Sequence, residues 1–311
     1  MSDVIALGID IGGTNVKVAL VKADGDVIAQ GSVPTAPERG PEIFVKAVAD
    51  YARQLTRENE IEWATIVGAG VGMAAFLDVE RGWVEESVNL HWRDVPIVEL
   101  LEKALDKPVR IDNDANVAAL GEAWLGAGRK AKTSLCITLG TGVGGGIVID
   151  GHIHRGASTM AGEIGHIHVK NQGALCNCGH YGCLETLSSA TAIVRAGKEA
   201  GLVGADGDLT AKDIFALAGQ GNDVAQGVID DMIYWLAVGL GVAANLLNPN
   251  VIVITGGVVN AGEALLKPLR EAFAKEALIR VARVCEIVPA ELGSEAGVLG
   301  AARLALQAVA S

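Results

Sequence analysis

The residues with the clearest chemistry lie in the middle of the chain, within about 45 residues, the size of a small supersecondary unit. A glycine-rich segment at 140–146 is followed by Glu163 and His166, and then by a cysteine cluster that ends in Glu185. Glycine-rich turns let backbone N–H groups surround phosphate oxygens, thiolates and imidazoles bind metals, and carboxylates accept hydrogen bonds from hydroxyl groups. The combination indicates phosphate, metal and polar-ligand chemistry in one region, which favours a phosphotransferase.

The metal chemistry rests on four residues: His166, Cys176, Cys178 and Cys183. Three thiolates and one imidazole form a closed tetrahedral set for Zn2+, which leaves no position for a reactive water. Clustered cysteines also suit a metal in a reducing compartment better than a disulfide framework. The alternative is a group of reduced thiols without metal. We expect a structural zinc whose removal destabilises the surrounding loop.

The phosphate chemistry rests on two glycine-rich turns, at residues 10–15 and 140–146, each next to short apolar strands. The second turn lacks the P-loop spacing and does not open a helix, so neither the P-loop nor the dinucleotide pattern applies. Each turn alone could be an ordinary hairpin, but the pair indicates a nucleotide held between two lobes. Asp10, at the end of its strand, is a candidate ligand for Mg2+. A third turn, at residues 255–257, is either a plain strand-to-helix turn or a place where a nucleoside approaches closely.

Polar residues outside these turns have two possible roles each. Asp114 follows Asn113 where a strand ends and a helix begins, so it is either the helix N-cap or a general base that accepts a hydroxyl proton. Glu163 and Glu185 flank the cysteine cluster and either order the loop or accept hydrogen bonds from sugar hydroxyls.

The elements that position these residues follow from hydrophobic periodicity and turn residues. A strand–glycine turn–strand unit occurs twice, which indicates a duplicated α/β chain with a break near residues 112–116. Strands are expected at 4–9, 16–21, 27–33, 65–72, 109–111, 133–138, 144–149, 251–254 and 284–289. Helices are expected at 41–58, 96–105, 115–125, 188–200, 211–218, 225–247, 263–277 and 296–308.

Composition limits the possible partners and location. The 311 residues are 50% hydrophobic but only 4% aromatic, so the core must be aliphatic. A formal net charge of -12 disfavours nucleic acid and anionic membranes as partners. No signal peptide is apparent, and the apolar run at 232–247 is too short to span a membrane and is expected to be a core helix. We expect a cytoplasmic protein.

These motifs, in this order, resemble those of the ROK family of bacterial sugar kinases and repressors, and are most similar to its glucokinase members. The motifs that carry the resemblance over essentially the whole chain are Asp10-x-Gly-Gly-Thr14, Asp112-Asn-Asp114, the glycine signature from 137 to 166, the cysteine cluster ending at Glu185, and Thr255-Gly-Gly.

The resemblance implies an α/β, two-lobed, actin-like ATPase (ribonuclease H-like) fold with a cleft between the lobes and a zinc-binding loop. Residues 1–112, completed by the C-terminal helix at 296–311, would form the small lobe, and residues 113–295 the large lobe. It implies transfer of the γ-phosphoryl group of ATP, with Mg2+, to the 6-hydroxyl of a hexose, with glucose expected first. Homodimers or homotetramers are also implied.

The resemblance assigns roles to individual residues. Asp114 would be the catalytic base, and His166 would serve both zinc and sugar. The implied sugar ligands are Asn89, Asn113, Asp114, Glu163, His166 and Glu185. The implied ATP and phosphate ligands are Asp10, Gly12, Gly13, Thr14, Asn15, Lys17, Gly140, Thr141, Gly142, Gly144, Gly256 and Gly257.

Two features bear on the substrate and on the class of protein. Glucokinase-like members often have Gly-x-Pro-Gly where this chain has Gly-Met-Ala-Ala at 72–75, but residues 89–96 follow the glucokinase pattern. The phosphate motif begins at Asp10, which leaves no room before it for the helix-turn-helix of the family's repressors. Kinases for mannose, fructose or an N-acetylhexosamine, a polyphosphate donor, and a non-catalytic sugar-binding regulator remain as alternatives.

Overall fold

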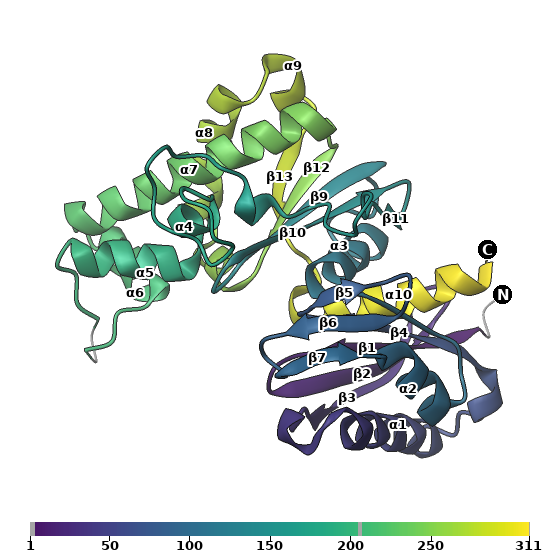
Figure 1. The fold of residues 1–311 in the computed structure, drawn as a ribbon. Helices are drawn as coiled ribbons and strands as arrows, with labels where there is room; N and C mark the ends of the chain where they lie inside the picture. Colours follow the sequence, from purple (N-terminus) through teal and green to yellow (C-terminus); the bar gives the residue numbers. More distant parts are fainter. Residues whose placement is uncertain (1–3, 205–206, 311) are drawn as a thin grey trace. The chain divides into compact units, whose positions relative to one another are not determined.

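The computed structural model describes residues 4–204 and 207–310, and the chain forms two compact units (Figure 1). The first unit contains residues 1–129, 151–161 and 294–311, and the second contains residues 130–150 and 162–293. Each unit has its own mixed α/β core, which confirms the expected α/β class.

The first unit is built on a five-stranded sheet with the strand order β3-β2-β1-β4-β8. The first three strands are antiparallel hairpins and the last two run parallel to β1. Residues 5–9 of β1 are buried, as expected for a strand covered on both faces. The strands are β1 (Ile5–Ile11), β2 (Asn15–Lys22), β3 (Val27–Pro34), β4 (Ile66–Met73) and β8 (Val109–Asn113).

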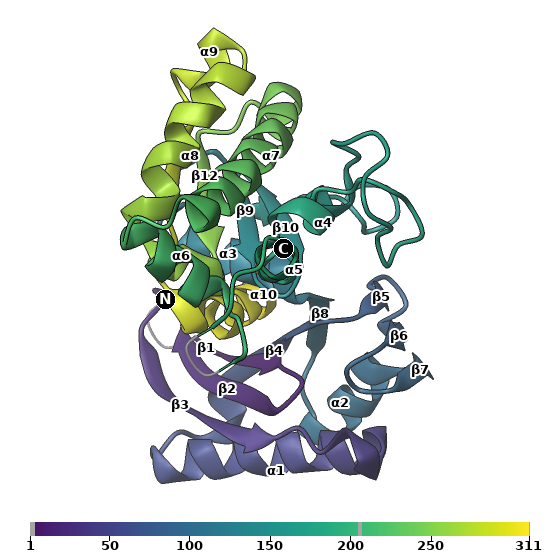
Figure 2. The same ribbon diagram turned by 90° about the vertical axis from the view of Figure 1, so that its left-hand side faces the viewer.

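Helices cover both faces of this sheet (Figure 2). One face carries α1 (Pro41–Glu58) and α2 (Ile97–Leu105), and the other carries α10 (Ala296–Ala310) and α3 (Asp114–Trp124). The C-terminal helix α10 lies very close to the sheet, because a Cβ added to Gly70 of β4 would lie 1.7 Å from the carbonyl oxygen of Ala301. The amphipathic α1, with one buried apolar face, closes the opposite side.

A small antiparallel sheet in the first unit was not expected from the sequence. It consists of β5 (Phe76–Asp78), β6 (Trp83–Ser87) and β7 (Trp92–Val95). These strands have three to five residues and little regular alternation of buried positions, so their periodicity is too weak to detect.

The second unit repeats the topology of the first. Its strands β10, β9, β12 and β13 are neighbours in that order, as β2, β1, β4 and β8 are in the first unit. Strands β9 and β10 form an antiparallel hairpin, and β12 runs parallel to β9 and β13. Their bounds are β9 (Thr133–Leu139), β10 (Val143–Ile149), β12 (Val251–Thr255) and β13 (Glu286–Pro289); the short β11 (His152–Ile153) follows β10. The structure thus contains the duplication that the paired glycine turns indicated.

The long helix α7 (Asp223–Leu247) packs against α6 (Ala211–Gly219) and α8 (Glu263–Glu276) in the second unit. Among the described residues it alone has the length and mean hydropathy, 1.5, of a membrane-spanning helix, but half of that apolar stretch is buried in the structure. A core helix has the same properties, as we expected for residues 232–247. The other helices are α4 (Glu185–Ser188), α5 (Ala190–Glu199), α6 (Ala211–Gly219), α8 (Glu263–Glu276) and α9 (Ile279–Ala282).

The unit boundary differs from the expected division after residue 112. Helix α3 and residues 151–161 group with the first unit rather than with the large lobe. The reason is the packing of α3 on α10, where a Cβ added to Gly300 would lie 1.6 Å from the carbonyl oxygen of Val117. Helices packed this closely, α3 and α10, belong to the same hydrophobic core.

Candidate active site and metal centre

The expected base lies where β8 ends and α3 begins. Asn113 is the N-cap of α3, because its side-chain oxygen accepts a hydrogen bond from the backbone N–H of Ala115 at 2.9 Å. Asp114 is therefore not the N-cap, and its residue is exposed. Although the residue as a whole is exposed, neighbouring protein atoms desolvate its carboxyl group and raise the pKa of Asp114, while the backbone N–H of Ala115 opposes this shift. A carboxylate with a raised pKa at an exposed helix start is suited to accept a proton.

A second acidic group, Asp10, lies at the end of β1 opposite Lys17 of β2. The pKa of Asp10 is raised to about 6, mainly by burial and also by the negative charges of Asp114 and Glu295, while Lys17 opposes the shift. The two candidate acids, Asp10 and Asp114, thus influence each other within the first unit. A partly buried carboxylate near other acids is a suitable cation ligand.

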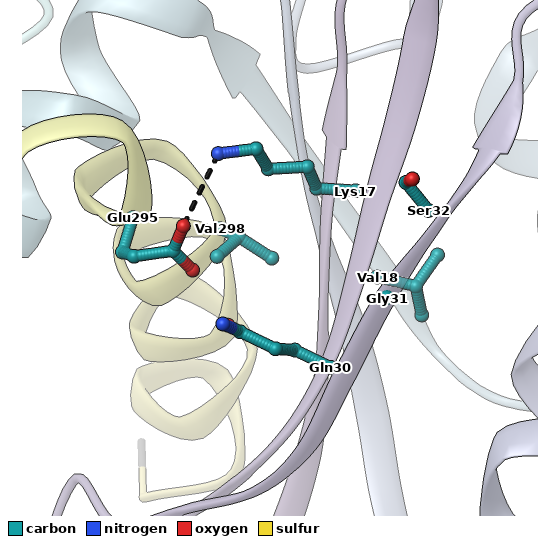
Figure 3. A pocket seen from close by; sticks show the side chains of 7 residues that line it. All are labelled: Lys17, Val18, Gln30, Gly31, Ser32, Glu295 and Val298. Atoms are coloured by element: carbon teal, nitrogen blue, oxygen red, sulfur yellow. Dashed lines mark hydrogen bonds and ion pairs between the residues drawn. The ribbon is translucent and has the colours of Figure 1, made fainter.

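Lys17 is tied to the start of α10 (Figure 3). Its Nζ lies 3.2 Å from Glu295 Oε1 and donates a hydrogen bond to the carbonyl oxygen of Ser294. Both side chains line a hollow of about 200 Å3 between β2, β3 and α10, together with Gln30. The sequence motif identified Lys17 but gave no indication of Glu295, which is 278 residues away.

The first glycine turn, at residues 12–15, is solvent-exposed. Its ends are held by Thr35, whose hydroxyl donates to the Gly12 carbonyl at 2.7 Å and whose N–H donates to the Thr14 carbonyl at 3.0 Å. The expected sugar ligand Asn89 is exposed beside this turn, since a Cβ added to Gly13 would lie 3.9 Å from Asn89 Cβ. An anchored turn with accessible backbone can receive a phosphate.

The four expected metal ligands come together in the second unit. The ligand atoms of His166, Cys176, Cys178 and Cys183 all lie within 4.8 Å of one another. Cys178 Sγ and Cys183 Sγ are 3.6 Å apart, and Cys176 Sγ is 3.5 Å from His166 Nδ1. Zn–S bonds of about 2.3 Å at a tetrahedral angle place two sulfur atoms about 3.8 Å apart. The donor set and its spacing therefore fit zinc.

His166 has a second nitrogen available for another task. With Nδ1 directed at the sulfur atoms, its Nε2 lies 3.9 Å from Glu163 Oε2. Both residues are exposed; Glu163 directly precedes the short 3-10 helix at Ile164–His166, and His166 is its last residue. This arrangement brings two of the expected sugar ligands together and places them beside the metal ligands.

Glu185 joins the cysteine cluster to the second glycine turn. Its Oε2 accepts a hydrogen bond from the backbone N–H of Val143 at 3.0 Å, and its Oε1 lies 3.8 Å from Cys176 Sγ. The turn is fixed further by Thr191, whose hydroxyl donates to the Thr141 carbonyl at 2.8 Å. The carboxylate that we expected to bind sugar thus also orders the turn between β9 and β10.

The third turn follows β12. Gly256 has φ +90°, and a Cβ there would lie 2.4 Å from the carbonyl oxygen of Leu139. Gly256 is therefore required by the backbone, and its neighbour Gly257 is exposed. Close packing of β12 on β9 explains why residue 256 is a glycine. Gly257 is exposed and is therefore accessible to a ligand.

Comparisons with known proteins match nearly the whole length of this chain. The model of the ROK family matches residues 6–308. The chain is 43% identical to the glucokinase of Halalkalibacterium halodurans, over 99% of this chain and 96% of that protein. The ROK hexokinase from Thermus thermophilus has a similar structure, with a TM-score of 0.89 and 32% identity, covering 98% of this chain and 99% of that one. A ROK family glucokinase from Streptomyces griseus, in complex with glucose and AMPPNP, has a TM-score of 0.77 and 34% identity, covering 97% and 99%.

Proposed function

Because this chain belongs to the ROK family, we propose that it is a glucokinase that transfers the γ-phosphoryl group of ATP to the 6-hydroxyl of glucose. The observation that carries the proposal is Asp114, a carboxylate at the start of α3 that the helix does not use as its cap. The similarity to glucokinases over nearly the whole chain, one of them solved with glucose and AMPPNP, supports glucose and ATP as the substrates.

In this proposal Asp114 accepts the proton of the sugar 6-hydroxyl as the oxygen attacks the γ-phosphorus. The new O–P bond forms while the bond from the γ-phosphorus to the β–γ bridging oxygen breaks, and ADP leaves with that oxygen. The raised pKa of Asp114 brings its proton affinity closer to neutral pH, which favours a general base. Positioning and neutralisation of charge supply the rest of the rate enhancement in this class of reaction.

The remaining residues bind the two substrates. We assign Asn89, Asn113, Glu163, His166 and Glu185 to the sugar hydroxyls, since amide and carboxylate groups match their donors and acceptors. Lys17, the exposed turn at 12–15 and the half-buried turns at 140–144 and 256–257 bind ATP phosphates and the nucleoside. Asp10 would hold Mg2+, which neutralises phosphate charge when bound.

A conservative variant tests the base. Asp114→Asn should lower kcat by about 10²- to 10⁴-fold, because it removes the proton acceptor but keeps the shape of the side chain. Sugar binding, followed by calorimetry, should remain measurable. Asp231→Asn, an equal change at an exposed position of α7, is the control and should leave kcat unchanged. Near-normal turnover of Asp114→Asn would exclude this residue as the base.

ADP release from Mg-ATP against a panel of sugars tests the reaction itself. Glucose should give the highest kcat/KM among glucose, mannose, fructose, N-acetylglucosamine and N-acetylmannosamine. If another sugar gave the highest kcat/KM, the kinase assignment would stand but the substrate would change. Replacing ATP with polyphosphate tests the phosphoryl donor. Sugar binding without ADP release would indicate a non-catalytic sugar-binding regulator.

We propose further that the enzyme acts in the cytoplasm as a homodimer or homotetramer and binds neither nucleic acid nor membranes. The net charge of -12 supports the last two statements through repulsion of phosphate-rich surfaces. Light scattering on the purified protein, whose protomer is 32.0 kDa, tests the oligomer, and a protomer mass would refute it.

A further inference from the structure

A buried carboxylate lies directly before the proposed base and sugar ligand. Asp112, in β8, is 1% exposed. Its Oδ1 accepts hydrogen bonds from the backbone N–H of Asn113 and from Asn116 Nδ2, both at 2.8 Å. A buried carboxylate requires such partners, because desolvating an unpaired charge costs several kcal/mol. Asp112 therefore links the end of strand β8 to the first turn of α3.

The geometry of Asn116 shows how strongly this link is enforced. Asn116 is 3% exposed, and its Oδ1 has no hydrogen-bond partner within the described part of the chain. Rotating the amide would turn Oδ1 towards the Asp112 carboxylate, where two acceptors would face each other. The carboxylate thus fixes the amide orientation even though an acceptor is left unsatisfied, which is unfavourable.

The third partner of Asp112 comes from a distant segment. Arg155 Nε donates to Asp112 Oδ2 at 2.7 Å, and the Arg155 side chain is 33% exposed. The segment at 151–161 that carries Arg155 is itself tied down. Gln307 Nε2 donates to the Gly151 carbonyl at 2.6 Å, and the hydroxyl of Thr159 donates to the Leu77 carbonyl at 3.3 Å. The segment that carries Arg155 is thus anchored at both Gly151 and Thr159, which restricts the position of the arginine.

We infer that Arg155 is a positioning residue for the reaction: through Asp112 it holds the start of α3 and so the places of Asn113 and Asp114. The inference rests on the proposed kinase function, in which both residues meet the sugar. Asp112 contacts the backbone N–H of Asn113 directly, so a shift of the carboxylate moves the residues that follow it. A displacement near 1 Å at a reacting group reduces turnover by about 100-fold.

Steady-state kinetics of Arg155→Gln tests the inference. This change should lower kcat by about 10- to 100-fold and leave KM for ATP within about twofold, since the proposed phosphate turns are not contacted by Arg155. Arg155→Lys, which retains the charge but loses the Nε fork, should be intermediate. Arg110→Gln is the matched control, because Arg110 is an exposed arginine on β8, the strand of Asp112, and its guanidinium donates a hydrogen bond to the carbonyl of the neighbouring Val109; its kcat should be normal.

The double variant Asp112→Asn/Arg155→Gln separates positioning from simple stabilisation. It removes the buried charge, so thermal stability should return towards that of the parent, while kcat stays low because Asn113 and Asp114 are no longer held in place. A kcat that recovers together with stability would refute a positioning role, as would an Arg155→Gln variant with kcat within twofold of the parent.

Hydrogen exchange makes the outcome independent of the proposed function. The N–H of Ala115, bonded to the Asn113 cap, should exchange faster in Arg155→Gln than in Arg110→Gln. If the parent phosphorylates no sugar, the kinase proposal fails, but this readout still decides whether Arg155 orders the start of α3. Unchanged protection at Ala115 would overturn the inference.

Discussion

At the scale of single residues, a carboxylate that suits the proposed chemistry can be unfavourable for the stability of the fold. Asp10 is held in a partly buried place where Asp114 and Glu295 add negative charge and only Lys17 opposes them. Such an arrangement is unfavourable for folding in the absence of a bound cation, and perturbed carboxylates of this kind cluster at functional sites.

Asp10→Asn should therefore make the protein more stable at neutral pH in the absence of Mg2+ and ATP. The pKa of Asp10 is about 6 in the folded state against 3.8 ordinarily, so the folded state binds its proton more tightly. The stability contributed by this proton is fully present below pH 3.8 and is lost as the pH rises through about 6. The gain in midpoint of urea unfolding from Asp10→Asn should thus grow between pH 4.5 and 7.5.

Asp213→Asn provides a control of opposite sign. The hydroxyl and N–H of Thr210 lower the pKa of Asp213, so its charged form stabilises the start of α6 at neutral pH. This variant should be less stable than the parent at pH 7.5. If Asp10→Asn were also less stable there, the burial and repulsion ascribed to Asp10 would be wrong.

At the scale of elements, the cysteine cluster and helix α4 fix the turn between β9 and β10. Glu185 at the start of α4 bonds to Val143 after the turn, and Cys183 lies two residues before Glu185. A metal that orders the cysteines thus also orders the proposed phosphate turn. Burial raises the pKa of Cys183 to about 12, so without a metal this thiol stays protonated.

Cys178→Ser should remove zinc and lower the melting temperature. The parent should contain one zinc per chain by elemental analysis, and the variant should contain much less, because three ligands rarely retain structural zinc. Cys285→Ala, which removes a buried cysteine outside the cluster, should keep its zinc. Equal zinc content in the parent and in Cys178→Ser would show that these thiols do not bind the metal.

A second element-scale prediction concerns the packing of α10 on α3. Gly300→Ala should destabilise the protein by about 1–3 kcal/mol, since its Cβ would lie 1.6 Å from the Val117 carbonyl oxygen and the helices would have to separate. Gly227→Ala, on an exposed face of α7 with no atom within 4 Å of the new Cβ, should instead stabilise by about 0.5–1 kcal/mol. Denaturant unfolding of both variants measures the contrast, and a neutral Gly300→Ala would contradict the close packing.

Local sequence patterns were sufficient for the principal strands, the hairpins at both glycine turns and the four metal ligands, because each depends on residues close in sequence. They were insufficient for two kinds of feature. The strands β5 to β7 are too short for periodicity to identify. The pairs Lys17–Glu295 and Asp112–Arg155 join residues 278 and 43 positions apart, and nothing local marks them as partners.

At the scale of the whole molecule, two similar units share one chain that passes between them four times, after Arg129, Asp150, Ala161 and Gly293. The proposed ligands are divided in the same way. Asn113 and Asp114 belong to the first unit, whereas Glu163, His166 and Glu185 belong to the second. The proposed function therefore requires both units to be folded, although each has its own sheet and could unfold separately.

Scanning calorimetry can reveal whether ligands engage both units. Glucose with AMPPNP should raise the melting temperature of every transition, because a ligand stabilises each unit that must be folded to bind it. Chelation of zinc, which acts on the second unit, should lower one transition more than any other. Asn113→Ala and Glu163→Ala, one in each unit, should each reduce the shift caused by glucose. A glucose shift confined to one transition and abolished by only one of these variants would place the sugar ligands in a single unit and would refute their division between the two.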